Sequence, residues 1–182
     1  LGTSTSAPSA KRGLSAQIIK HDEYRFLVDC GEGTQIQMIK YKIRRGKISH
    51  IFISHLHGDH YFGLVGLINT FGLLNHSQEL HVYGPEPLQE IIEMQLRVGE
   101  NKLPYPLHFH TLFENAVLVD NDRICIKCFK TNHRILCFGF SFEEKAGKRK
   151  LLIDKVRKAK IPISFYHSLQ NGLDYITSRG EI

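Results

Sequence analysis

Short apolar runs alternate with stretches of helical periodicity along the 182 residues of this chain. Strands are expected where apolar residues alternate or run continuously, and helices where they recur every three or four positions. This pattern predicts strands at 15–19, 25–29, 48–54, 80–83, 107–111, 116–119, 124–131 and 135–142. It predicts helices at 34–41, 61–74 and 87–96, and a short basic helix before Pro162. Because strand and helix signals interleave, the predicted class is α/β or mixed α+β.

Length and composition narrow the class of protein further. Apolar residues make up 42% and charged residues 23% of the chain, which is typical of a globular domain with its own core. No window reaches the run of about 18 apolar residues that a membrane helix needs, so no membrane partner is expected. No signal peptide is visible, although the chain does not begin with Met and a leader could be missing.

The four cysteines are too sparse for a disulfide framework, which favours a reducing, cytoplasmic location. They are Cys30, Cys125, Cys128 and Cys137. Cys125 and Cys128 form a CxxC pair inside an apolar, strand-like run. Either a metal knuckle or two ordinary strand cysteines could produce this spacing, and the second interpretation is favoured because no second CxxC completes a ligand set.

Positive charge is concentrated near the C-terminal end. Residues 145–160 hold eight basic residues and one acid, a net +7 that exceeds the +6 of the whole chain. The basic residues are Lys145, Lys148, Arg149, Lys150, Lys155, Arg157, Lys158 and Lys160. Such a cluster favours a polyanionic partner, although a solvated charged face is the alternative.

The strongest chemical signal is a group of three histidines and an aspartate directly after one predicted strand. His55 and His57 are two positions apart, so their side chains project to one face of an extended segment. Gly58 allows a sharp turn, after which Asp59 and His60 can point back toward the same region. This arrangement can supply two metal ions that lie a few ångströms apart. A cluster of surface or capping histidines is the alternative interpretation.

The HxHxDH pattern after an apolar strand resembles the signature of the metallo-β-lactamase superfamily, which implies an αβ/βα sandwich with a two-metal hydrolytic site. Over residues 1 to about 142 the chain more specifically resembles ribonuclease Z, an endonuclease that matures the 3′ end of tRNA. The motifs that carry this resemblance are LGTS and PS within 1–9, FLVDCGEGTQ at 26–35, IFISHLHGDH at 51–60, VYGP at 82–85, and NH at 132–133 followed by FGF at 138–140.

This resemblance implies roles for individual residues. His55, His57 and His133 would hold one zinc ion. Asp59 and His60 would hold part of a second ion, and Asp59 would also orient or deprotonate a water molecule. Zinc is the expected metal, although manganese or another divalent ion suits the same ligands.

Other residues would position the site or bind the RNA. Asp29 resembles a carboxylate that orients a ligand histidine, and Lys11 and Arg12 lie where the family contacts RNA phosphate. The basic residues within 145–160 lie where the family carries a tRNA-binding arm, although the usual Gly-Pro-rich stretch is not evident. The implied substrate is therefore precursor tRNA, held by phosphate contacts.

The chain departs from the family pattern after residue 142. The family's later bridging Asp, further ligand His and proton-donating His have no counterpart: His167, Asp154 and Asp174 lie in other contexts. We therefore expect 1–142 to be the N-terminal half of a metallo-β-lactamase-like domain and 143–182 to be a basic, arm-like segment. An uncovered apolar face would then favour a homodimer, domain exchange or poor solubility.

Three functional hypotheses follow from the sequence. The first is a zinc-dependent endoribonuclease that removes 3′ trailers from precursor tRNA by two-metal phosphodiester hydrolysis. The second is a hydrolase of the same fold that acts on a small phosphodiester, sulfate ester or thioester, which the basic segment argues against. The third is a truncated tRNA-binding module without catalytic activity, which the intact HxHxDH motif argues against for the parent protein.

Overall fold

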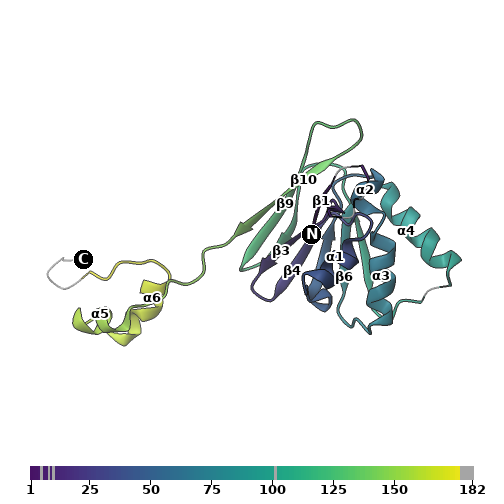
Figure 1. Ribbon diagram of the computed structural model, residues 1–182. Helices are drawn as coiled ribbons and strands as arrows, with labels where there is room; N and C mark the ends of the chain where they lie inside the picture. The colour runs from purple at the N-terminus through teal and green to yellow at the C-terminus, as the bar shows by residue number, and fades with distance from the viewer. Residues whose placement is uncertain (5, 8, 10, 101, 177–182) are drawn as a thin grey trace. The chain divides into compact units, whose positions relative to one another are not determined.

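A computed structural model describes residues 1–4, 6–7, 9, 11–100 and 102–176 of the chain (Figure 1). The chain divides into two compact units, which are described separately. The first unit comprises residues 1–118 and 126–142, and the second comprises residues 119–125 and 143–182.

A five-stranded sheet forms the centre of the first unit, with the strand order β3-β4-β5-β6-β7. The strands are β3 (Gln17–His21), β4 (Tyr24–Val28), β5 (Ile48–Phe52), β6 (Leu80–Gly84) and β7 (Leu107–Thr111). The β3–β4 pair is antiparallel, and the pairs from β4 to β7 are parallel. Parallel neighbours end at the same edge of the sheet, so the segments that follow β4 and β5 are brought together.

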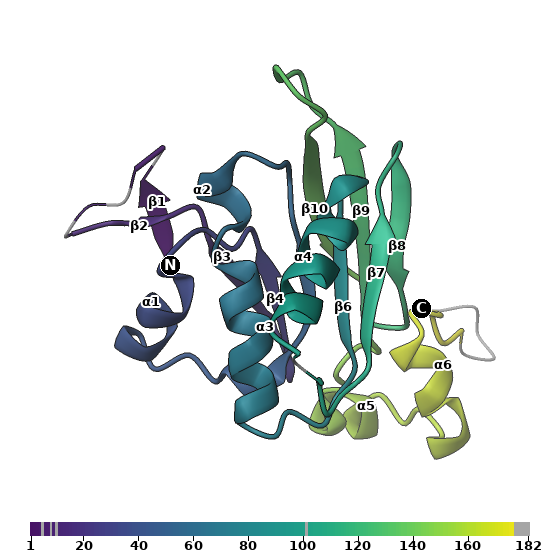
Figure 2. The ribbon, with the colours of Figure 1, turned by 90° about the vertical axis from the view of Figure 1, so that its right-hand side faces the viewer.

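Three helices cover one face of this sheet (Figure 2). They are α1 (Thr34–Lys40), α3 (Leu64–Leu73) and α4 (Pro87–Val98). Their apolar residues and the inward-facing strand residues, including Leu27, Ile51, Val82, Leu67 and Ile92, form one buried cluster. Burial of these aliphatic side chains is the main stabilising contribution in this layer.

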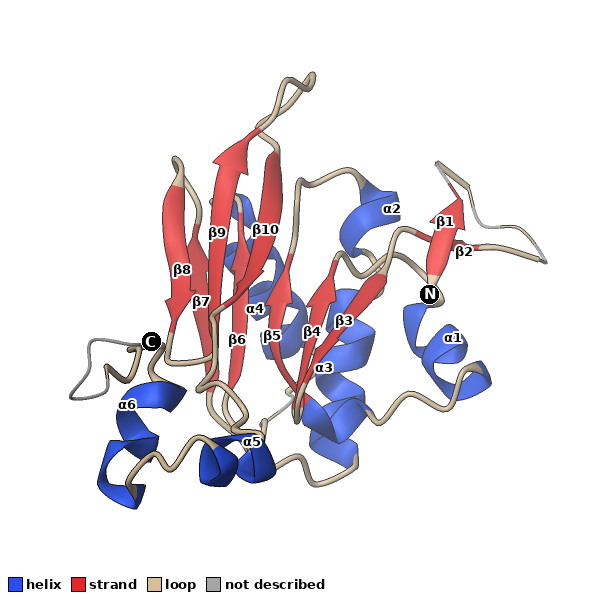
Figure 3. Ribbon diagram, turned by 90° about the vertical axis from the view of Figure 1, so that its left-hand side faces the viewer, coloured by secondary structure: helices blue, strands red, loops and turns tan. Residues whose placement is uncertain are grey.

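A second, three-stranded sheet with the order β10-β9-β8 packs on the opposite face (Figure 3). Its strands are β8 (Ala116–Asp120), β9 (Ile124–Lys130) and β10 (Phe138–Glu144). The two layers meet through aromatic rings: Phe52 lies 5.3 Å from Phe140, and Phe26 lies 5.7 Å from Phe142, between ring centroids. These two stacked layers confirm the predicted mixed α/β class and give the α-β-β order of half a sandwich.

The helix predicted at 61–74 is interrupted near its beginning. The structure has a short α2 (Gly58–Tyr61) followed by α3, with Phe62 and Gly63 between them. The Gly63 amide donates a hydrogen bond to the Cys30 carbonyl at 2.9 Å, and a Cβ at Gly63 would lie 2.3 Å from the Gly31 oxygen. Close approach of the β4–α1 turn therefore decides where α3 begins.

The N-terminal residues form a short parallel pair, β1 (Gly2–Ser4) with β2 (Gly13–Leu14). The strand predicted at 135–142 begins later, at Phe138, whose amide donates to the Ser54 carbonyl at 2.9 Å. The remaining predicted strands and helices agree with the structure to within two residues at most ends.

The second unit contains α5 (Ile153–Lys158), a 3-10 turn η2 (Ile163–Phe165) and α6 (Tyr166–Gln170). Helix α5 ends before Pro162, as predicted, and buries Val156. Its basic side chains and those of residues 145–150 are exposed. Among the described residues, no helix is long and apolar enough to cross a membrane.

Candidate metal centre

The histidine-rich segment follows β5 at the edge of the sheet where β4 also ends. β5 ends at Phe52, and the chain continues in extended form through His55 and His57 into α2. The Asp29 amide, directly after β4, donates to the Phe52 carbonyl at 2.8 Å. This parallel pairing places the end of β4 beside the beginning of the histidine segment.

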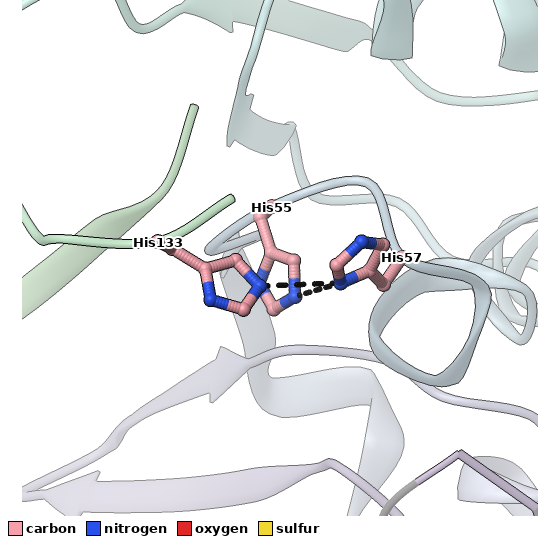
Figure 4. A group of neighbouring side chains, drawn as sticks. All are labelled: His55, His57 and His133. Atoms are coloured by element: carbon pink, nitrogen blue, oxygen red, sulfur yellow. Dashed lines mark hydrogen bonds between the residues drawn. The ribbon is translucent and has the colours of Figure 1, made fainter. Parts of the chain in front are cut away.

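Three histidines converge on one point in space (Figure 4). Nε2 of His55 lies 3.0 Å from Nδ1 of His57, and Nε2 of His133 lies 3.2 Å from the same Nδ1 atom. His133 comes from the connection between β9 and β10, 76 positions away from His57. The three nitrogen atoms all lie within 4.8 Å of one another, so they could hold one metal ion.

This donor set fits a divalent transition metal. Imidazole nitrogens coordinate zinc at about 2.0–2.1 Å, which separates tetrahedral neighbours by roughly 3.3 Å. The Ser54 hydroxyl lies 2.9 Å from Nδ1 of His55, so the other ring nitrogen of His55 faces the cluster. Burial, followed by the neighbouring His60, lowers the pKa of His55 to about 4. His55 is therefore neutral at pH 7, the form that binds metal.

Asp59 and His60 lie beside this cluster on α2. Oδ2 of Asp59 lies 3.7 Å from Nε2 of His60 and accepts a hydrogen bond from the Ser6 amide at 2.9 Å. Burial raises the pKa of Asp59, but the Ser6 hydrogen bond and the charge of His60 outweigh it, and the net pKa lies below the ordinary value. One carboxylate oxygen and one imidazole nitrogen therefore face each other at the spacing of a second, partial ligand set.

Asp29 holds the other side of the His60 ring. Its Oδ2 lies 2.7 Å from Nδ1 of His60, and its Oδ1 accepts the Ser54 amide at 2.9 Å. The Ser15 hydroxyl donates to Oδ2 at 3.0 Å. Burial lowers the pKa of His60, but the hydrogen bond and charge of Asp29 raise it by more, so the net shift is upward. Asp29 is itself 4% exposed, so its carboxylate is fixed in place by these contacts.

These groups share one open cavity of about 800 Å³. Three of its polar lining residues were not expected from the sequence: Ser6, Glu32 and Arg134. Nη2 of Arg134 lies 3.2 Å from Nε2 of His57 and adds a positive charge to the cavity lining. Arg134 directly follows His133, so a search for basic residues next to the candidate ligands would have found it.

None of the candidate RNA-binding residues is among those that line this cavity. Lys11 and Arg12 are exposed in the connection between β1 and β2 and do not line the cavity, although Ser6 of the same connection does. The basic residues of 145–160 belong to the second unit. Within that unit, Lys145 pairs with Asp120, and the Arg149 amide donates to the Gln170 carbonyl.

The cysteines are not part of the candidate site. All four are free, and Cys125 and Cys128 are buried on β9, which agrees with their interpretation as strand residues. Burial raises the pKa of the Cys30 thiol to about 12, so this thiol stays protonated and unreactive.

Two solved structures resemble this architecture. Human tRNase Z, short form, is 36% identical with a TM-score of 0.71, over 79% of this chain and 62% of that protein. YhfI from Bacillus subtilis, described as a metallo-β-lactamase fold protein, is 20% identical with a TM-score of 0.57, over 75% of this chain and 53% of that protein, which is a likeness of fold alone. The two-layer fold and the histidine cluster thus define a protein of the metallo-β-lactamase fold.

Sequence comparisons identify the family and the relatives of this chain within this fold. A family model described as the anti-Pycsar protein Apyc1 matches residues 1–153, and the chain belongs to that family. Ribonuclease Z of Bacteroides fragilis is 37% identical over 184 residues, covering 100% of this chain and 60% of that protein. Ribonuclease Z of Ligilactobacillus salivarius is 40% identical over 167 residues, covering 89% of this chain and 53% of that protein. The predicted resemblance to ribonuclease Z is confirmed, and the chain spans 53–60% of the length of these relatives.

Proposed function

We propose that the protein is a metal-dependent endoribonuclease that removes 3′ trailers from precursor tRNA by phosphodiester hydrolysis. The observation that carries this proposal is the convergence of His55, His57 and His133 beside the Asp59–His60 pair, in a chain whose relatives are ribonucleases Z. Because the chain spans 53–60% of the two relatives described above, the activity of the whole relatives is part of the proposal.

The proposal assigns His55, His57 and His133 to one metal ion, and Asp59 and His60 to part of a second. Zinc suits the nitrogen-rich first set, and manganese would be accepted by the same ligands. When bound, the metal supplies Lewis acidity at a phosphoryl oxygen and makes water more acidic. These assignments are supported by the atoms that face one another in the cavity.

The chain's own side chains would position the substrate and move protons. Asp59, held ionised by the Ser6 amide, would orient the attacking water and accept its proton. Asp29 would fix the His60 ring so that Nε2 faces the cavity. Arg134 would stabilise negative charge on the phosphate as it develops in the transition state.

We propose that two further regions contact tRNA phosphate. One is the β1–β2 connection with Lys11 and Arg12, and the other is the exposed basic set of the second unit. We retain the division into residues 1–142, which carry the site, and 143–182, which carry the arm. Phosphate contacts of this kind are strongly salt-dependent, with roughly one counterion released per contact.

The proposal also includes a homodimer and a cytoplasmic location. The exposed apolar side chains on and beside β8 and β9 include Phe113, Val117 and Phe129, and a second copy would cover them. Four free cysteines suit a reducing compartment. Native mass spectrometry of the protein would report the dimer and the number of bound metals together, and a monomer would contradict the first part.

The central test is the Asp59→Ala variant on a precursor tRNA with a 3′ trailer. We expect cleavage to be lost while tRNA binding is retained, and cleavage that survives this substitution would overturn the mechanism.

Replacing Lys155, Arg157 and Lys158 by alanine should weaken tRNA binding and flatten its salt dependence, with little change in the hydrolysis of bis(p-nitrophenyl) phosphate. Hydrolysis of that small diester without any cleavage of precursor tRNA would instead favour a small-substrate hydrolase.

A further inference from the structure

A second cavity, of about 560 Å³, lies at the β3 edge of the five-stranded sheet. Strands β3 and β4 form one wall, the connection from α1 to β5 forms another, and Leu1 also lines the cavity. Four basic side chains line it: Lys20, Arg25, Lys42 and Arg44. No described aspartate or glutamate is among the lining residues, so four positive charges share this cavity without a carboxylate inside it.

The register of the hairpin places two of these charges directly opposite each other. Lys20 and Arg25 are cross-strand partners in the antiparallel β3–β4 pair. Like charges in this arrangement repel each other and destabilise a sheet. Nη1 of Arg25 donates to the carbonyls of Asp22 and Tyr24, which anchors the guanidinium at the end of the hairpin. The nearby Glu23 carboxylate pairs with Lys47 at 3.2 Å and is not among the residues that line the cavity.

The second wall comes from an unusually basic segment. Residues 40–47 contain five lysines and arginines and no acid. Tyr41 of this segment lines the cavity with 57% of its surface exposed, and Ile18 and Ile43 add apolar surface. The cavity therefore combines charges for an anion, a ring for stacking and an apolar floor.

We propose that this cavity binds a nucleotide phosphate, as part of an RNA strand or as a free nucleotide. Arginine and lysine are the side chains that recognise phosphate, arginine by a bidentate fork and lysine as a point charge. Nζ of Lys40 lies 5.8 Å from the centroid of the exposed Tyr41 ring. A base would stack on this ring, since base–aromatic stacking is tolerant of sequence. A cavity of this volume lies in the range of small-ligand sites and accommodates one or two nucleotides.

This site is separate from the histidine cluster. Arg25 lies at the start of β4, opposite Ile48 at the start of β5, whereas Asp29 follows the end of β4. The path along the strand from Arg25 to Asp29 is roughly 13 Å. A nucleotide bound at the basic cavity is therefore not the one whose phosphate would meet the histidines.

Binding measured in EDTA tests the proposal without involving the metal centre. The probes are a fluorescein-labelled hexauridylate, followed by anisotropy, and free UTP, followed by calorimetry. We expect the Lys42→Ala/Arg44→Ala variant to raise the Kd for the bound probe at least about tenfold, because two charge-assisted contacts are lost. Binding of hexauridylate alone identifies an RNA strand as the ligand, and comparable binding of UTP identifies a free nucleotide.

The matched control is Arg97→Ala/Lys102→Ala, which removes the same charge from α4 and from the segment after it, and neither residue lines the basic cavity. Its Kd should stay within about twofold of the Kd of the unsubstituted protein. An equal loss of affinity in both variants would show non-specific attraction and overturn the site.

Photo-crosslinking with 5-iodouridine in the hexamer should label the peptide that contains Tyr41. Labelling confined to 145–160, or no binding of either probe, would also overturn it. Because only binding is measured, the result does not depend on whether the histidine cluster cleaves tRNA.

Discussion

Oδ2 of Asp29 lies 2.7 Å from Nδ1 of His60, although the two residues are 31 positions apart in the chain. The contact fixes the orientation of the His60 ring, and Nε2 is left 3.7 Å from the Asp59 carboxylate. Histidines that bind metals usually donate their other ring N–H to such a carboxylate. The pair therefore links the turn after β4 to helix α2, which carries Asp59 and His60.

Replacing Asp29 by asparagine should lower metal affinity by roughly 10–100-fold, because the amide cannot stabilise the His60 ring as a carboxylate does. Competition with a chromophoric chelator would measure this affinity. Ser15→Ala is the matched control, since it removes only one hydrogen bond to Asp29, and its loss should be clearly smaller. An Asp29→Asn protein with unchanged zinc affinity would contradict the positioning role.

Gly63→Ala should destabilise the fold and weaken metal binding together. The added Cβ would lie 2.3 Å from the Gly31 oxygen, so the turn after β4 and helix α2 must separate. A loss of about 1–3 kcal/mol in the free energy of unfolding is expected from such overpacking. Urea denaturation would measure it. Gly46→Ala is the control, because nothing lies within 4 Å of its Cβ position, and equal losses in the two variants would contradict the close-contact argument.

Zinc should raise the melting temperature of the protein, because a ligand that binds only the folded state stabilises it by about 2.7 kcal/mol at 100 times its Kd. For a chain of this size that corresponds to a shift of roughly 5–10 °C. His133→Ala should lose most of the shift, since one of three nitrogen donors disappears. His108→Ala, an exposed histidine outside the cluster, should keep it. A full shift in the His133 variant would remove that residue from the metal site.

Stability should fall as the pH drops from about 6.5 to about 4, in part because of His50. Burial, followed by the charges of His81 and His110, lowers the pKa of His50 to about 4. In the unfolded chain His50 takes up a proton near pH 6.5, whereas in the folded protein it does so only near pH 4. The loss of stability therefore begins below pH 6.5 and is complete near pH 4. The contribution of His50 is on the order of 3 kcal/mol.

Urea denaturation in EDTA at pH 7 and pH 5 would measure this dependence. His50→Phe should reduce the difference in the free energy of unfolding between the two pH values, because a phenyl ring keeps the stacking with His81 and does not titrate. Its hydrogen-bonding contact with Ser49 would disappear at both pH values alike. His167→Phe in the second unit is the matched control. Identical pH dependence in the His50 variant and the original protein would show that another group carries the effect.

Much of the fold could be predicted from local patterns. The apolar run before His55 predicted a buried strand, and β5 is buried at Ile48, Ile51 and Phe52. Helix α4 and strand β7 begin at the predicted residues for the same reason, since periodicity reports which face is buried. The break between α2 and α3 was missed because it depends on the backbone of Gly31, a residue outside the helix.

Only part of the candidate site could be predicted from local patterns in the sequence. His55, His57, Asp59 and His60 could be named from spacing, because neighbours in sequence are necessarily neighbours in space. His133 and Asp29 were identified only by resemblance to a family, and the contacts of Arg134 and Ser6 with the site were not foreseen. Those contacts join segments far apart in the chain, and no local pattern encodes them.

The sequence by itself determined the element types, the four clustered ligand candidates and the excess of positive charge. Only the tertiary structure decided that His133 completes a three-nitrogen cluster, that Asp29 holds His60, and that Lys20 and Arg25 share a cavity with Lys42 and Arg44. The physical reason is that local propensity and periodicity act over a few residues, whereas parallel strand pairing and core packing bring together side chains from segments that are distant in the chain.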